Sequence, residues 1–315
     1  MKMKDVNIPN GVWPTMLTPF TNSNEVDYGA LGQLVEWYIA QGVHGLFAVC
    51  QSSEMFYLSL EERVAIARFV KEKASGRVPV IASGHISDGF DEQVEELQRM
   101  ADTGVDAVVL VSNRLAGPEE SDEVWLNRAM ELLDRVPDVL FGIYECPYPY
   151  KRLMTPKLLK WCADTGRFGF LKDTSCDLKH IAEKLDAVKG SPLKIFNANS
   201  ATLLESLRLG AAGFSGVMAN FHPELYVQLM ERWDLESNTA EMIQAFVGPA
   251  SLIELQMYPV NAKYHLQKIG LPLAIHCRTR DSSNFRENQR FEVEQLDSLY
   301  HLFKQQIMKK QNVNV

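Results

Sequence analysis

The chain has 315 residues, of which 46% are hydrophobic, and a formal net charge of −8 at neutral pH. This length suits one large domain, because α/β barrels often reach it as a single unit, and the acidic charge argues against nucleic acid or an anionic membrane surface as partner. No apolar run resembles a signal peptide or a membrane span, and the five cysteines show no CxxC spacing. We therefore expect a cytoplasmic protein that binds a small molecule and has neither a disulfide framework nor a thiolate zinc site.

Eight short apolar runs alternate with amphipathic helical patterns through most of the chain. The runs predict strands at Val12–Thr18, Gly45–Val49, Val78–Ala82, Asp106–Val111, Val139–Tyr144, Phe168–Leu171, Leu193–Phe196 and Ala211–Val217. Runs that are apolar nearly throughout are typical of parallel strands covered by helices on both faces. Eight such strand and helix units predict an α/β fold, a (β/α)8 TIM barrel. A doubly wound open sheet is the rival, but no GxGxxG motif follows an early strand.

The strand signals stop after about Trp233, and three helical patterns follow. We therefore expect residues 1–235 to form the (β/α)8 barrel catalytic domain. Residues 236–315 are expected to form a C-terminal helical extension.

Lys172 stands at the carboxyl end of the sixth predicted strand, in the sequence FLKDTSC. Barrel enzymes carry their chemistry at this end of their strands. An amine held there loses hydration, so its pKa falls and the neutral form that can attack a carbonyl becomes populated. The alternative interpretation is a lysine that leads the chain out to solvent, as most lysines do.

Tyr144 ends the fifth predicted strand, the neighbour of the strand that carries Lys172. A phenol beside an amine suits Schiff-base chemistry, in which the lysine condenses with a 2-oxo group and the tyrosine moves protons. Tyr144 could equally be an aromatic plug at the rim of the barrel. Further polar groups expected at the strand ends are Gln51, Ser52, Glu145, Asn197, Asn199 and Ser215, the last followed by Gly216.

Several of these segments occur together in one known family. They are LTPF (17–20), GVHGLFAVCQSSE (42–54), LSLEER (58–63), PVIASG (79–84), GIYECP (142–147), FLKDTSCDL (170–178) and GAAGFSGVMAN (210–220). In this combination the chain resembles the dihydrodipicolinate synthase and N-acetylneuraminate lyase family. The resemblance implies a class I enzyme in which Lys172 forms the Schiff base and Tyr144 is the catalytic tyrosine. It implies no cofactor beyond the covalent imine, and a homo-oligomer, a tetramer or a dimer.

The resemblance also assigns the loop after the second strand. Gln51 and Ser52 fall where the family holds the carboxylate of the 2-oxo acid, although an ordinary polar loop capping the next helix is the alternative. We expect Ser215 and Gly216 to line the same site.

Departures from the family pattern bear on the substrate. Asn113, Arg114 and Leu115 replace the Pro-Tyr-Tyr of dihydrodipicolinate synthases, and Pro149 stands where those enzymes place the arginine that grips their second substrate. Aspartate semialdehyde should therefore bind poorly. Glu145, Asn197, Asn199 and Ser215 offer donors and acceptors for the hydroxyl groups of an extended chain, which predicts a 2-oxo-3-deoxy sugar acid, with pyruvate as product or co-substrate.

Three alternatives stay open. The first is the condensation that dihydrodipicolinate synthases perform. The second is a catalytically inactive barrel that binds a 2-oxo acid, because the segment Cys50–Glu54 departs from the family loop. The third is a metal-dependent barrel enzyme, which has little support because the seven histidines are scattered and only His85 follows a predicted strand.

Overall fold

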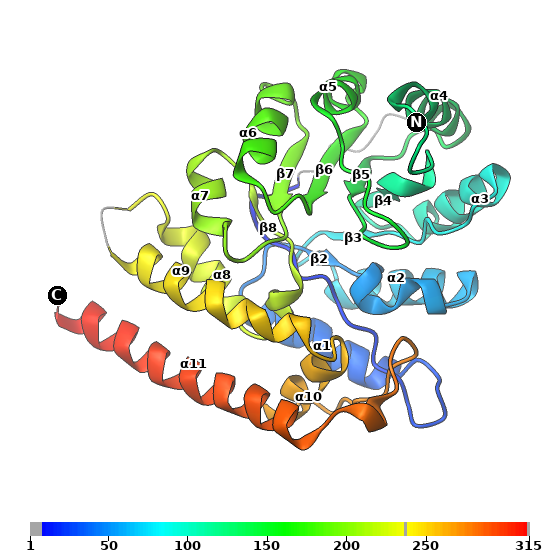
Figure 1. Cartoon of the computed structure of the whole chain (residues 1–315). Helices are drawn as coiled ribbons and strands as arrows, with labels where there is room; N and C mark the ends of the chain where they lie inside the picture. Colours follow the sequence, from blue (N-terminus) through cyan, green and yellow to red (C-terminus); the bar gives the residue numbers. More distant parts are fainter. Residues whose placement is uncertain (1–7, 236–237, 314–315) are drawn as a thin grey trace.

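The computed structural model describes residues 8–235 and 238–313. Its centre is a sheet of eight parallel strands surrounded by helices (Figure 1). The strands are β1 (Gly11–Val12), β2 (Leu46–Phe47), β3 (Val80–Ala82), β4 (Ala107–Val111), β5 (Phe141–Tyr144), β6 (Phe168–Asp173), β7 (Lys194–Asn197) and β8 (Gly213–Phe214). Each overlaps one of the eight predicted runs, so the predicted α/β barrel is confirmed.

The sheet curls until its first and second strands meet. Its order runs β1-β8-β7-β6-β5-β4-β3-β2, and a parallel bridge between Thr15 and Phe47 joins the two ends. The contact between β1 and β8 is close: a Cβ atom on Gly213, which has a φ of +152°, would lie 2.0 Å from the Gly11 carbonyl oxygen. Glycine is therefore required where the last strand joins the first.

Eight helices follow the eight strands and cover the outside of the barrel. They are α1 (Tyr28–Ala40), α2 (Leu60–Ala74), α3 (Phe90–Ala101), α4 (Asp122–Arg135), α5 (Pro156–Thr165), α6 (Leu178–Ala187), α7 (Leu203–Arg208) and α8 (Pro223–Arg232). Local signals fix their starts: Ser59 and Glu62 form a capping box at α2, and Thr155 caps α5 immediately before Pro156.

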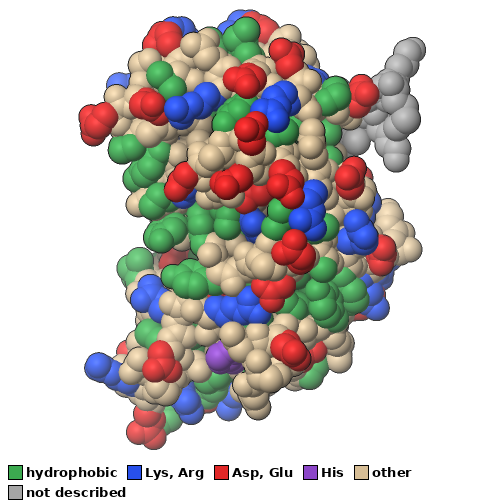
Figure 2. Space-filling model, turned by 90° about the vertical axis from the view of Figure 1, so that its right-hand side faces the viewer, with side chains coloured by type: hydrophobic (Ala, Val, Ile, Leu, Met, Phe, Trp, Pro, Cys, Tyr) green, Lys and Arg blue, Asp and Glu red, His purple; other side chains and the backbone are tan. Residues whose placement is uncertain are grey.

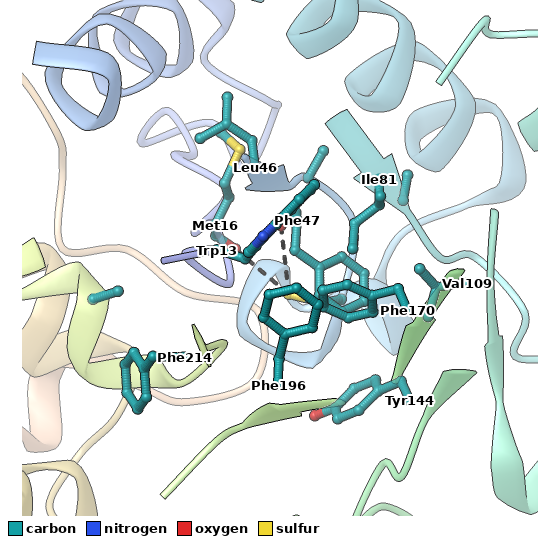
Figure 3. Close-up of a cluster of buried hydrophobic side chains, with 14 of the residues drawn as sticks. Trp13, Met16, Leu46, Phe47, Ile81, Val109, Tyr144, Phe170, Phe196 and Phe214 are labelled. Atoms are coloured by element: carbon teal, nitrogen blue, oxygen red, sulfur yellow. Dashed lines mark hydrogen bonds between the residues drawn. The ribbon is translucent and has the colours of Figure 1, made fainter. Parts of the chain in front are cut away.

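Aromatic rings fill the inside of the barrel (Figure 3). The ring centroids of Phe170 and Phe196 lie 4.5 Å apart, and Trp13 meets Phe170 edge to face at 5.5 Å. Tyr144 joins this cluster with its ring 5.9 Å from that of Phe47. The cluster therefore forms an apolar layer inside the barrel, and Tyr144 lies at its edge with the strand ends.

The remaining helices are α9 (Thr239–Ala250), α10 (Val260–Lys268) and α11 (Glu287–Val313), with a short 3₁₀ helix, η5 (Ser251–Leu255), after α9. Helix α9 packs on α8, and α11 runs along α9 and α10 (Figure 1). The predicted division between residues 235 and 236 adjoins residues 236–237, which lie outside the described residues.

The surface carries both signs of charge. On the face shown in Figure 2, acidic and basic side chains are interspersed, so neither sign dominates it. None of the helices in the described part of the chain combines the length and the apolar character that crossing a membrane requires.

Candidate active site

A cavity of about 610 Å³ opens at the carboxyl ends of the strands. Five of the residues singled out from the sequence line it: Gln51, Ser52, Tyr144, Lys172 and Asn199. Its volume is in the range of small-molecule sites, and it lies at the end of the barrel where such sites are expected.

Lys172 lies at the base of this cavity, where β6 brings it beside Tyr144. The two residues are register partners on β5 and β6, and the Lys172 Nζ atom is 4.6 Å from the centre of the Tyr144 ring. Only 3% of Lys172 is exposed. Burial lowers the pKa of Lys172, and the nearby Cys50, Cys146 and Glu254 oppose the shift. A larger fraction of this amine is therefore neutral than in an ordinary exposed lysine.

Tyr144 presents its hydroxyl group to the loop after β2. The hydroxyl donates a hydrogen bond to Gln51 Oε1 over 3.2 Å. Burial raises the pKa of Tyr144 well above that of an ordinary tyrosine, and the neighbouring thiols of Cys146 and Cys50 add to the shift. The phenol thus stays protonated in the resting site and has a proton to give.

The loop after β2 is held by contacts with the C-terminal extension. Its residue Glu54, in the left-handed conformation with a φ of 65°, forms a fully buried ion pair with Lys263 Nζ at 2.8 Å. The same carboxylate accepts hydrogen bonds from the backbone N–H groups of Arg278 and Thr279, at 2.6 Å and 2.8 Å. These contacts fix the loop that carries Gln51 and Ser52 against the extension.

Ser52 is expected to bind the carboxylate of the substrate. Its hydroxyl lines the cavity and donates to Thr15 Oγ1 over 3.1 Å. Replacing Ser52 by alanine should weaken pyruvate binding by about 1–3 kcal/mol, the usual cost of losing a hydrogen bond to a charged group. Titration calorimetry would measure this.

A matched control is Ser200→Ala, because Ser200 is a buried serine that bonds Tyr226 outside the cavity. The control should keep the parental affinity for pyruvate. Equal affinity in Ser52→Ala and the parent protein would remove Ser52 from the binding site.

Two of the predicted rim residues point away from the cavity. The Glu145 carboxylate is fully buried and binds Lys184 on α6, and the Asn197 amide donates to Thr202 and Ser206 at 3.0 Å. Neither residue lines the cavity. Both side chains instead bond residues of the surrounding helices, and the expectation that they meet substrate hydroxyl groups stays a prediction.

The pair after β8 is also structural. Ser215 is fully buried and donates to the carbonyl oxygen of Trp13 over 3.0 Å, and neither Ser215 nor Gly216 lines the cavity. At Gly216 a Cβ atom would lie 2.4 Å from the Ala198 carbonyl oxygen. Ser215 thus joins β8 to the segment after β1, and the expectation that this pair binds substrate stays a prediction.

The extension supplies cavity residues that inspection of strand ends could not find. Glu254, Tyr258, Thr279 and Arg280 all line the cavity. Burial raises the pKa of Glu254, and the charge of Lys172 opposes the shift.

The site and fold define a (β/α)8 barrel with a buried lysine and a tyrosine on neighbouring strand ends. The chain belongs to the dihydrodipicolinate synthetase family, whose sequence model matches residues 8–296. It is thus a carbon–carbon or carbon–oxygen lyase of this family's type. In the described part of the chain, no three or more His, Cys, Asp or Glu side chains are grouped as a metal site.

Similar proteins agree with this assignment. The 4-hydroxy-tetrahydrodipicolinate synthase of Saccharophagus degradans is 26% identical over 306 residues, which cover 96% of this chain and 99% of that protein. The enzyme of the same name from Acidithiobacillus ferrooxidans is 29% identical over 264 residues, 83% of this chain and 89% of its own. The crystal structure of YagE from E. coli K12, in complex with pyruvate, matches with a TM-score of 0.83 at 24% identity over 94% of this chain and 98% of YagE.

Proposed function

We propose that Lys172 forms an imine with the 2-oxo group of its substrate and that Tyr144 moves the protons of this reaction. The observation that carries the proposal is the burial of the Lys172 amine at the base of the cavity, beside the protonated Tyr144 hydroxyl. The YagE structure, which has the same fold, contains pyruvate, the simplest 2-oxo acid of this kind.

The residues can carry a complete reaction sequence. The neutral Lys172 amine adds to the 2-oxo carbon, and the Tyr144 phenol gives its proton to the carbinolamine hydroxyl, which leaves as water. The resulting phenolate takes the proton of the C4 hydroxyl, the C3–C4 bond breaks, and its electron pair forms an enamine on Lys172. The cleavage releases an aldehyde, and Tyr144 gives the proton that it has just taken to C3 of the enamine. Water then hydrolyses the imine and releases pyruvate. Loss of a C3 proton and of the C4 hydroxyl would instead give dehydration.

We propose a 2-oxo-3-deoxy sugar acid as the substrate. Of the rim residues expected from the sequence, Asn199 lines the cavity, and the extension adds Glu254 and Thr279. Carboxylate, amide and hydroxyl groups of this kind suit the hydroxyl groups of an extended substrate. We further propose a cytoplasmic homo-oligomer, a tetramer or a dimer, as the working form.

The second candidate is condensation of pyruvate with aspartate semialdehyde. The two sequence relatives named above are 4-hydroxy-tetrahydrodipicolinate synthases. A guanidinium group, that of Arg280, lines the cavity. Arg280, from the extension, could bind a second carboxylate there.

Steady-state kinetics on a panel of substrates separates the candidates. The panel includes 2-oxo-3-deoxy sugar acids with one and with two carboxylates. We expect kcat/KM for pyruvate release from such an acid to exceed kcat/KM for the condensation by about tenfold or more. A tenfold ratio corresponds to about 1.4 kcal/mol in transition-state binding. Faster condensation would overturn the substrate assignment. No turnover on either, with an imine still formed at Lys172, would make the protein a 2-oxo acid binder.

A further inference from the structure

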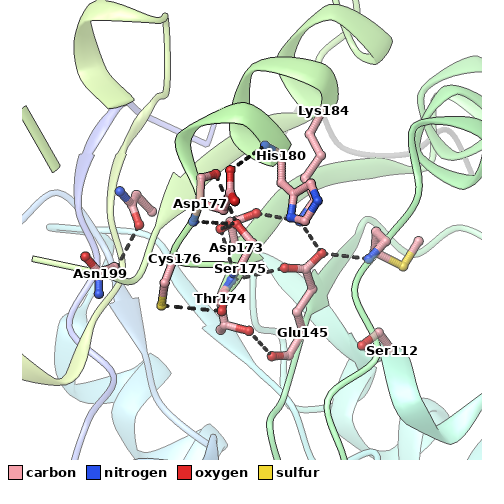
Figure 4. A network of polar contacts seen from close by, with 12 residues as sticks. Ser112, Glu145, Asp173, Thr174, Ser175, Cys176, Asp177, His180, Lys184 and Asn199 are labelled. Carbon is pink, nitrogen blue, oxygen red and sulfur yellow. Dashed lines mark hydrogen bonds and ion pairs between the residues drawn. The ribbon is translucent and has the colours of Figure 1, made fainter. Parts of the chain in front are cut away.

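Another buried lysine, Lys184, contacts the residues that follow Tyr144 and Lys172 in the chain. Lys184 projects from α6, is 2% exposed, and has its Nζ atom 2.5 Å from Glu145 Oε1. The same ammonium group contacts Asp173 Oδ2. Figure 4 shows Lys184 reaching from α6 to the two carboxylates.

The alternation of side chains along a strand explains why these two carboxylates meet. Successive residues point to opposite faces, so when Tyr144 and Lys172 face the cavity, the residue after each faces the surrounding helices. These following residues are Glu145 and Asp173. A single ammonium group thus binds the residue next to each of the two reacting side chains.

Further hydrogen bonds tie the ends of β5 and β6 together at this point. Glu145 accepts from the backbone N–H groups of Met154 and Thr174, at 2.7 Å and 3.0 Å. Thr174 Oγ1 in turn donates to the Glu145 carbonyl oxygen over 2.7 Å. The segments that leave the two strands are therefore joined through the Glu145 side chain and its backbone.

Lys184 supplies positive charge to this cluster of carboxylates. Two carboxylates lie beside one ammonium group in a region closed to solvent. Burial raises the pKa of Glu145, Lys184 opposes the shift, and Asp173 adds to it. Without the ammonium group, one carboxylate would take up a proton, and the bridge between the ends of β5 and β6 would be lost.

We propose that Lys184 is a positioning residue: by binding Glu145 and Asp173 together, it fixes the distance between the Tyr144 hydroxyl and the Lys172 amine. This inference rests on the proposed function of those two residues. Proton transfer requires hydrogen-bond reach between the reacting groups, and a displacement of about 1 Å costs about 10²-fold in rate.

The test compares Lys184→Met with the parent protein on pyruvate and on the best substrate of the panel. We expect kcat and the rate of imine formation to fall by about 10²-fold, while KM for the 2-oxo acid changes little, because the carboxylate loop after β2 is untouched. Lys184→Arg keeps a cation between the carboxylates and should restore much of kcat.

Arg63→Met is the matched control. Arg63 forms another buried ion pair, 2.8 Å from Glu96, and neither residue lines the cavity. This variant should lose stability yet keep kcat at a temperature where it is folded. Equal effects of Lys184→Met and Arg63→Met on kcat would show that Lys184 is only structural.

Two further measurements complete the design. If Lys184→Met does not fold, it is combined with Glu145→Gln, so that one charge of each sign is removed. This double variant should fold and show the same loss of kcat. A parental kcat in the double variant would overturn the proposal. Failure of the parent protein to form an imine at Lys172 would overturn the proposed function and the role of Lys184 with it. An imine formed equally fast in parent and variants would overturn the role of Lys184 alone.

Discussion

Replacing Lys172 by arginine is expected to reduce turnover below detection on every 2-oxo acid substrate. Arginine keeps the positive charge but stays protonated and cannot add to a carbonyl. The conservative change Lys71→Arg serves as control, because Lys71 pairs with Asp106 outside the cavity. Residual turnover of Lys172→Arg above the uncatalysed rate would show that the chemistry belongs to another group.

The same residue should set the pH dependence of imine formation. The reactive form is the neutral amine, whose fraction rises with pH and levels off above the pKa of Lys172. Because burial lowers this pKa from the ordinary 10.5, the rate with pyruvate should level off at a lower pH than for an exposed lysine. The raised pKa of Tyr144 keeps its proton in place through this range, so the tyrosine should add no fall in rate there.

Replacing Tyr144 by phenylalanine should lower kcat by about 10²–10⁴-fold, the usual contribution of general acid–base assistance. The substitution keeps the ring in its edge-to-face contact with Phe47 and removes the hydroxyl that bonds Gln51. The thermal midpoint should therefore change little. Stopped-flow measurement of imine formation and steady-state turnover would record the loss.

The matched control for this substitution is Tyr226→Phe. Tyr226 is a fully buried tyrosine whose hydroxyl bonds Ser200 away from the cavity, so its loss should leave kcat near that of the parent. Unchanged turnover in Tyr144→Phe would reduce Tyr144 to an aromatic plug at the rim of the barrel.

The sequence predicted the fold and the meeting of Lys172 with Tyr144 for a clear physical reason. Strands buried on both faces are apolar nearly throughout, so all eight could be located. In a barrel of this topology consecutive strands are neighbours, and the residues at the ends of β5 and β6 must therefore lie side by side. The burial that lowers the pKa of Lys172 accompanies its place at the end of β6, over the ring of Tyr144.

Of the rim residues expected from the sequence, several do not line the cavity. Glu145 follows Tyr144 directly, and strand alternation should have placed it on the helix side, where the structure has it beside Lys184. Glu254 and Arg280 could not be assigned from patterns, because helical periodicity shows which face of a helix is buried but not which strand end it packs against. Such long-range contacts are set by the tertiary fold.

The most direct test of the central claim is reductive trapping. The protein is incubated with pyruvate and borohydride, digested, and mapped by mass spectrometry. The proposed function predicts one reduced pyruvyl group on Lys172 and none in Lys172→Arg. An unmodified Lys172, or a modification on another lysine such as Lys151 at the same cavity, would contradict it.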